Sequence, residues 1–185
     1  LPKQLGVQLH EPSIEELVPY IDWTPFFQTW DLHGKYPQIL SDTVVGEAAS
    51  KVFADAQQLL AQVIIDQILQ CKGVSGIFPA NSVGDDIEIY DVQTKEILHR
   101  QITLRQQTKK VAGQANMALA DFIAPKISGL QDYIGAFVVT AGLGIEHYIS
   151  DFDAKQDDYN SIMIKALADR LAEAFAEYLH AHVRK

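Results

Sequence analysis

Asp22 is the first residue whose type and setting suggest chemistry. It lies within YIDWTPFFQTW (residues 20–30), where five of the chain's 17 aromatic side chains fall in eleven positions. Thr24-Pro25 is typical of a helix start, and a carboxylate just before a helix N-terminus is favoured in its ionised form. Such a group can accept a hydrogen bond from a ligand ammonium. Asp22 is therefore either an acid at the edge of a core helix or part of the rim of a ligand site.

A second candidate is a row of acids near the end of the chain. Asp169, Glu173 and Glu177 follow one another at intervals of four, in a stretch with helical periodicity. Like charges at this spacing cost about 0.2–0.5 kcal/mol per pair, and Lys165 offsets only the first. The row is either a solvated helix face or a surface that a cation or a partner's basic surface neutralises. The pattern leaves both interpretations open.

Other motifs that could carry catalysis are incomplete. The six histidines have no zinc-ligand spacing, and Gly142-x-Gly144 lacks the third glycine of a dinucleotide loop. Gly84-Asp85-Asp86 is typical of a hairpin turn and has no further ligand at a calcium-loop spacing. We find no nucleophile motif and predict no catalytic residue and no metal. The sequence favours a binding or accessory domain.

Composition limits the class of protein further. The chain has 185 residues, 48% of them hydrophobic and 21% charged, which is typical of one globular domain, or one with two lobes. Its net charge of −9 argues against nucleic acid as a partner. The single Cys71 excludes an internal disulfide and fits a reducing compartment. No leader or apolar run long enough to span a bilayer is present, so we expect a cytoplasmic protein without membrane contact.

The elements that must position these acids follow from periodicity. Aromatic residues at i, i+3, i+4 and i+7 predict a helix with Thr24 as N-cap and Gly34 near its end. An amphipathic stripe predicts a longer helix from residue 46 to about Cys71, closed by Lys72-Gly73. The last helix is expected from about Asp157 to the end of the chain.

The predicted strands cover residues 74–80, 86–91, 96–104 and 132–140, with the last as the best buried. Residues 1–19 are expected to form an extended arm with a short helix at 14–18, and residues 118–125 a helical or irregular connection. Helices, then a meander of strands, then a helix indicate an α+β fold.

With these stretches in view, the chain resembles one known family. The segments that carry the resemblance run in order over nearly the whole chain: YIDWTPFFQTWDLHGKYPQIL (20–40), GIFPANSVGDDIEIY (76–90), LRQQ (104–107), ADFIAP (120–125), DYIGAFVVTAG (132–142) and DDYNSIMIKALADRLAEAFAEYLH (157–180). They are similar to the C-terminal activation domain of cobalamin-dependent methionine synthase.

The resemblance implies a fold and a function. The fold is a C-shaped single α+β domain, with a twisted antiparallel sheet, flanking helices and a long C-terminal helix. The family domain binds S-adenosylmethionine and presents it to cobalamin carried by a neighbouring domain of the same polypeptide. An electron from flavodoxin or a diflavin reductase, together with this methyl group, restores methylcobalamin after cob(II)alamin has formed. This places the chain within a methyltransferase of methionine biosynthesis, with no turnover of its own.

The resemblance also assigns residues. It implies that Asp22 and Glu173 contact S-adenosylmethionine and that Asp169 faces the cobalamin domain, although Glu173 could serve either surface. The family's Arg-Pro-Ala-Pro-Gly-Tyr-Pro motif, which contributes to the same ligand site, follows the long helix and is absent from this sequence. The chain starts at Leu1 and stops at Lys185 within a helical pattern, so we expect it to be the N-terminal and central portion of the domain. Two alternatives remain: a protein-docking module without ligand binding, or a stand-alone reactivator of another corrinoid protein.

Overall fold

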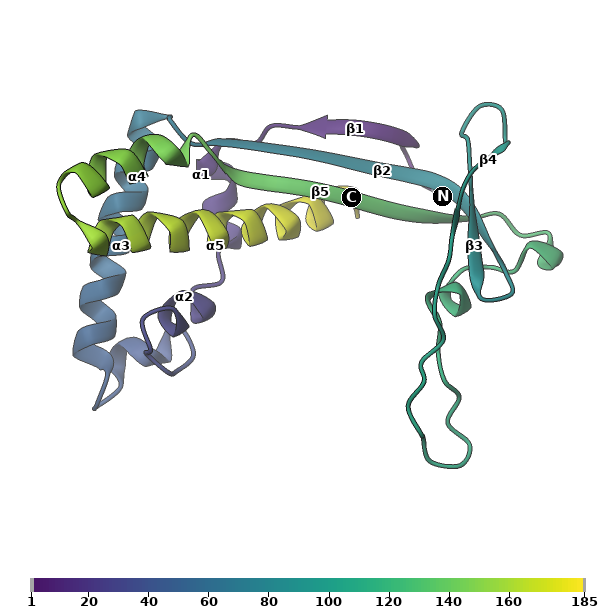
Figure 1. The fold of residues 1–185 in the computed structure, drawn as a ribbon, viewed down its shortest axis with the longest axis horizontal. Helices are drawn as coiled ribbons and strands as arrows, with labels where there is room; N and C mark the ends of the chain where they lie inside the picture. The colour runs from purple at the N-terminus through teal and green to yellow at the C-terminus, as the bar shows by residue number, and fades with distance from the viewer. Residues whose placement is uncertain (1, 185) are drawn as a thin grey trace. The chain divides into compact units, whose positions relative to one another are not determined.

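A computed structural model describes residues 2–184 of the chain. The described residues form an α+β fold with a five-stranded sheet (Figure 1). The elements in chain order are β1 (Gly6–His10), α1 (Ile14–Leu17), η1 (Val18–Tyr20), α2 (Thr24–Gln28), η2 (Gln38–Ser41), α3 (Gly46–Asp66), β2 (Gln70–Val83), β3 (Asp86–Tyr90), β4 (Ile97–Gln101), η3 (Leu119–Phe122), η4 (Lys126–Ser128), β5 (Asp132–Leu143), α4 (Ile145–Ala154) and α5 (Asp158–Val183).

The chain divides into two compact units, which we describe separately. Unit 1 comprises the residues up to Leu9 together with Val74–Val138, and unit 2 comprises His10–Gly73 and the residues from Val139 onward. The division falls within β2 and within β5. Unit 2 carries all three candidate acids, Asp22, Asp169 and Glu173.

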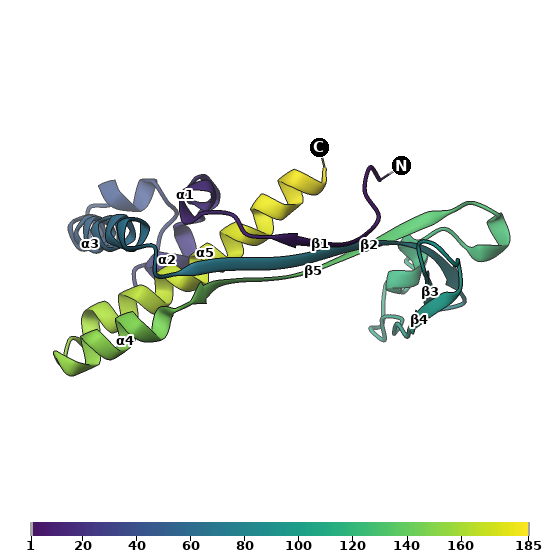
Figure 2. The same ribbon diagram turned by 90° about the horizontal axis from the view of Figure 1, so that it is seen from above.

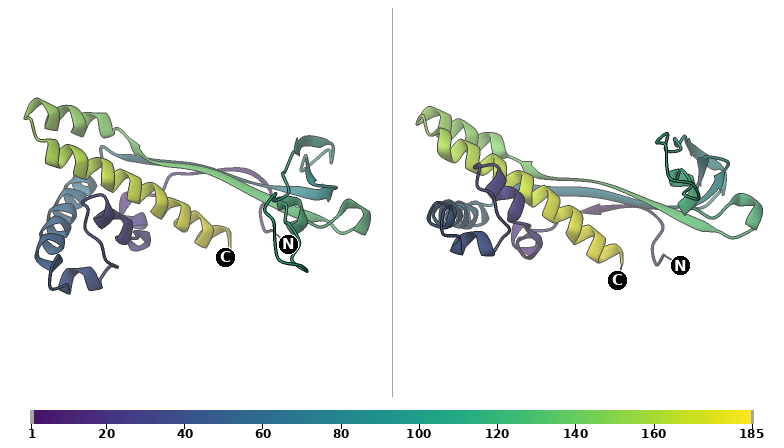
Figure 3. Two further views of the ribbon diagram at one scale, coloured as in Figure 1. Left: turned by 60° about the horizontal axis from the view of Figure 1, so that its bottom comes forward. Right: turned by 90° about the horizontal axis from the view of Figure 1, so that it is seen from below.

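Unit 2 is organised around α5, which confirms the predicted last helix. The Asp157 side chain caps α5 by accepting a hydrogen bond from the backbone N–H of Asn160 at 3.0 Å. The apolar stripe of this helix faces the core, with Ile164, Leu171 and Phe175 fully inaccessible to solvent. A helix that the sequence did not reveal, α4, packs along α5 (Figure 3).

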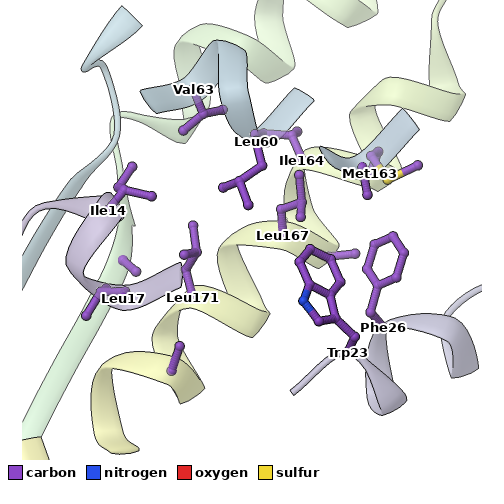
Figure 4. Packing of buried hydrophobic residues seen from close by; sticks show 14 of the residues in the cluster. Ile14, Leu17, Trp23, Phe26, Leu60, Val63, Met163, Ile164, Leu167 and Leu171 are labelled. Atoms are coloured by element: carbon purple, nitrogen blue, oxygen red, sulfur yellow. The ribbon is translucent and has the colours of Figure 1, made fainter. Parts of the chain in front are cut away.

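The core of unit 2 joins helices that are remote in sequence. Figure 4 shows Ile14 and Leu17 of α1 and Leu60 and Val63 of α3 gathered with Trp23, Phe26 and residues of α5. The predicted aromatic stripe is confirmed at Trp23, Phe26 and Phe27, which are buried, whereas Trp30 is only half-buried. The core therefore fixes the short segment that contains Asp22.

Several predicted boundaries in unit 2 are wrong. Thr24 is the first residue of α2 rather than its N-cap, and its hydroxyl accepts a hydrogen bond from the backbone N–H of Tyr36 at 3.3 Å instead of capping the helix. The helix ends at Gln28, well before Gly34. The helix α3 ends at Asp66 because Gln67 takes the left-handed conformation (φ 53°). Residues 70–73, which were expected to close α3, begin β2 with alternate residues buried.

Unit 1 contains the expected meander. In the sheet β1 lies beside β2, and β5 also pairs with β2 (Figure 2). β2 and β3 pair in antiparallel register from Ala80↔Ile89 to Val83↔Asp86, and β4 pairs antiparallel with β3. The turn between β2 and β3 starts at Gly84, whose φ of +63° suits glycine.

Two strand predictions in unit 1 need correction. The strand expected over residues 74–80 is part of the longer β2, which runs on to Val83 and includes Asn81, whose amide donates to the carbonyls of Ala124 and Leu130. The strand expected to be the best buried, β5, has a run of exposed residues in its middle, including Val138 at 76%. An apolar composition favours a strand, but burial depends on what packs against it.

Candidate functional site

Asp22 lies between η1 and α2 with its carboxylate at the surface. Its Oδ1 atom accepts a hydrogen bond from the backbone N–H of Thr24 at 2.9 Å, which forms a local turn that orients the side chain. Its neighbour Trp23 is 7% exposed. The residue that follows this acid is thus buried in the core, while Asp22 itself is exposed.

The segment of Asp22 is held against α5 by aromatic contacts. Two residues before the acid, the ring of Tyr20 packs edge-on against Tyr178 of α5, with the ring centroids 5.7 Å apart. One residue after it, Trp23 enters the core cluster that contains Leu167 (Figure 4). The structure therefore packs the segment of Asp22 onto the helix that carries Asp169 and Glu173.

The acidic row on α5 is organised by an arginine of the same helix. Arg170 Nη1 donates to Glu173 Oε2 at 2.9 Å, and Nη2 donates to Glu173 Oε1 at 2.9 Å and to Asp169 Oδ2 at 2.5 Å. The Arg170 side chain is 9% exposed, whereas those of Asp169 and Glu173 are 68% and 65% exposed. Two of the three acids in the row are therefore neutralised in part by this chain's own cation.

Burial and hydrogen bonding act in opposite directions on this arginine. Burial alone lowers the pKa of Arg170, but the hydrogen bonds to Asp169 and Glu173 outweigh it, and the pKa is raised above its usual value. The guanidinium is charged throughout the physiological range. The group of Asp169, Arg170 and Glu173 thus carries one net negative charge.

Sequence reasoning did not assign a role to Arg170. A signal was nevertheless present, because Arg170 follows Met163 and Leu167 at intervals of seven and three and so lies on their buried stripe. Its aliphatic stem can pack there while the guanidinium reaches the surface acids. An arginine on an apolar stripe, with acids one and three residues away, is the pattern that indicates a guanidinium fork, in which one arginine donates to both neighbouring carboxylates.

Three hollows of the described chain lie away from these acids. One of about 300 Å³ in unit 2 is lined by residues that include Glu11, Cys71 and Lys72, and one of about 580 Å³ in unit 1 includes Asp121 and Lys126. A third, of about 370 Å³, lies beside Tyr159 in unit 2. None of these three is lined by Asp22 or Glu173, and both acids are exposed.

Between residues 2 and 184 no three histidine, cysteine, aspartate or glutamate side chains are grouped closely enough to hold a metal ion. No helix in this range combines the length and apolar character needed to cross a bilayer. Cys71, the only cysteine, is a buried free thiol whose pKa is raised to about 11 by burial.

Comparison with known proteins adds the family. The family model described as "Vitamin B12 dependent methionine synthase, activation domain" matches residues 13–185. A crystal structure of the MetH reactivation domain bound to AdoHcy is 57% identical to this chain, with a TM-score of 0.95. The match covers 100% of this chain and 57% of that one, so this chain spans little more than half of its relative. The resemblance seen in the sequence motifs and the α+β fold expected from it are both confirmed. The chain belongs to the activation-domain family of vitamin B12-dependent methionine synthases.

Proposed function

We propose that this chain contributes to a binding site for S-adenosylmethionine and presents its methyl group for the reductive remethylation of cob(II)alamin. The observation that carries the proposal is the 57% identical relative, which was crystallised with AdoHcy. AdoHcy is S-adenosylhomocysteine, the product that remains when S-adenosylmethionine has transferred its methyl group. A site that accepts the product is expected to accept the methyl donor as well.

The charges of unit 2 support this ligand. S-adenosylmethionine carries a sulfonium and an ammonium group against one carboxylate, and is cationic overall. Asp22 is exposed beside the start of α2, and Glu173 is exposed on α5. Opposite charges at short range favour binding even in partly solvated surroundings. We propose Asp22 and Glu173 as ligand contacts and Asp169 as a contact to the partner domain.

The wider assignment follows from the family. The partner would be a cobalamin-binding domain, and its cobalt would accept the methyl group after an electron arrives from flavodoxin or a diflavin reductase. We further propose that the chain is the N-terminal and central portion of the activation domain. It would act in the cytoplasm as one module of a methyltransferase, positioning the donor without turnover of its own.

Calorimetry tests the ligand. S-adenosylmethionine would be titrated into this chain and into a chimera joined to the segment of the relative that this chain does not span. We expect saturable heat in the chimera, because the family resemblance implies an Arg-Pro-Ala-Pro-Gly-Tyr-Pro motif after the long helix that completes the site. 5′-Methylthioadenosine, which lacks the amino-acid portion and the positive charge, is the matched ligand and should bind more weakly.

The result also separates the alternatives. If neither protein gives heat with S-adenosylmethionine, the ligand proposal fails. If the chimera nevertheless binds an isolated cobalamin domain, the docking-module interpretation replaces it.

A further inference from the structure

Arg170 makes a two-pronged contact that the family resemblance does not explain. Both guanidinium nitrogens Nη1 and Nη2 donate to the two oxygens of Glu173, each at 2.9 Å. Nη2 also donates to Asp169 Oδ2. A single, nearly buried cation therefore holds an acid proposed to contact the ligand and an acid proposed to face the partner domain.

We propose that Arg170 is a positioning residue, which fixes the Glu173 carboxylate in the orientation that receives the cationic part of S-adenosylmethionine. The inference rests on the proposed function. Arg170 itself need not touch the ligand.

The physical reason is preorganisation. Glutamate is a flexible side chain, and at 65% exposure Glu173 would otherwise sample several rotamers. Parallel hydrogen bonds from a planar guanidinium hold both carboxylate oxygens in a defined plane. Because the Arg170 side chain is only 9% exposed, the clamp is itself fixed by the packing of α5. A carboxylate that is already ordered loses less conformational entropy when a ligand arrives.

Charge and geometry predict opposite results for the loss of Arg170. Removing a positive charge next to Glu173 would strengthen the attraction of the site for a cation if charge alone mattered. If Arg170 acts by orienting Glu173, its removal weakens binding despite that gain. The sign of the change therefore separates the two explanations.

The test is calorimetry with S-adenosylmethionine on whichever of the two proteins, this chain or the chimera, binds the ligand. Arg170→Lys keeps the charge but loses the fork, and we expect it to weaken binding by roughly three- to tenfold. Arg170→Met loses both, and we expect weaker rather than tighter binding. Equal or tighter binding by either variant would overturn the inference.

A double-mutant cycle shows whether Arg170 acts through Glu173. We expect Glu173→Gln to weaken binding, and Arg170→Lys added to it to cause less than about a twofold further loss. A second loss as large as the first would mean that Arg170 acts independently, which overturns a positioning role. A merely structural effect on folding would also add to the loss in this way.

Lys165→Met is the matched control on the same helix. Lys165 contacts Ser161 at 3.3 Å and lies one turn before Asp169, so its loss changes the local charge by the same amount as Arg170→Met. Binding should stay unchanged or tighten slightly; weakening as large as that of Arg170→Met would overturn the inference. If the unchanged protein gives no heat, the proposed function fails and the inference with it. If the unchanged protein binds and the Arg170 variants bind with the same affinity, the inference is wrong while the proposed function stands.

Discussion

The ring of Phe175 on α5 lies directly against the backbone of Gly73 in β2. A Cβ atom at Gly73 would lie 2.7 Å from Cζ of Phe175 and 3.2 Å from Cγ1 of Val139, closer than unstrained contacts allow. Phe175 is fully buried, so a displacement of its ring would disturb the surrounding core. The absence of a side chain at residue 73 therefore lets β2 approach the helix that carries Asp169 and Glu173.

Gly73→Ala should destabilise unit 2. The added methyl group must displace a buried ring, and overpacking of this kind costs about 1–3 kcal/mol. Urea unfolding followed by tryptophan fluorescence reports on this unit, because both tryptophans, Trp23 and Trp30, lie in it. Gly142→Ala is the control within the same unit, since the nearest atom, Cβ of Ala168, would lie 3.8 Å from its Cβ, and its effect should be small. Equal loss in both variants would contradict a specific clash with Phe175.

Asp22→Asn should weaken the binding of S-adenosylmethionine. The amide keeps the size of the side chain and can still accept from Thr24, but it loses the charge that would attract a cation. We expect about a tenfold loss of affinity, typical of removing one charged contact at a partly solvated site. Asp31→Asn is the control, because Asp31 is also exposed and its left-handed conformation (φ 56°) suits asparagine. Unchanged affinity in the Asp22 variant would remove Asp22 from the site.

Asp169→Asn should reduce association with a cobalamin-binding domain more than it reduces ligand affinity. Asp169 is 68% exposed and accepts one hydrogen bond from Arg170, whereas Glu173 accepts two. Its charge is thus available to a partner, while the Glu173 fork survives its loss. Surface plasmon resonance at low and high salt measures the association. Glu177→Gln, at the acid one turn beyond Glu173, should have the smaller effect on association. A larger effect of Glu177→Gln than of Asp169→Asn would contradict a partner-facing role for Asp169.

Acidification should weaken unit 1 in part through Glu88. This carboxylate is 3% exposed and accepts hydrogen bonds from Lys126 and Arg100 at 2.6 Å and from Tyr90 at 3.0 Å. The Lys126 hydrogen bond, with help from Tyr90 and Arg100, holds the pKa of Glu88 below its usual value, although burial opposes this. A lowered folded-state pKa means that the stabilisation is complete above the unfolded-state value of about 4.3 and is lost as the pH falls below it.

Hydrogen exchange of the β3 and β4 amides between pH 6 and pH 3 checks this expectation, after correction for the intrinsic pH dependence of exchange. The corrected protection should fall on acidification in the unchanged protein. Glu88→Gln should start from lower protection and lose less of it over the same range, because the titrating group is gone. Glu96→Gln, an exposed acid just before β4, should behave like the unchanged protein. The idea fails if Glu88→Gln keeps the full acid dependence.

The sequence by itself determined the features that depend on near neighbours along the chain. The stripe from Ile164 to Leu179 and the capping Asp157 specify α5, because positions three and four apart share one helix face. Gly84 specifies the turn between β2 and β3 for an equally local reason. Long irregular motifs such as DWTPFF carried the family assignment and named Asp22, Asp169 and Glu173 as candidates.

Only the tertiary structure decided which remote residues meet. The sequence predicts the end of a helix at Gly73, because nothing local reveals that Phe175, about a hundred positions later, leaves no space for a side chain there. The apolar sequence of β5 predicts a buried strand, but it does not reveal what packs against the middle of the strand, which is exposed. The sequence pattern assigns no role to Arg170, since its contacts with Asp169 and Glu173 depend on the burial of its stem in unit 2. Periodicity is set by the geometry of one element, whereas burial and clamping are set by contacts between elements, and these exist only once the chain has folded.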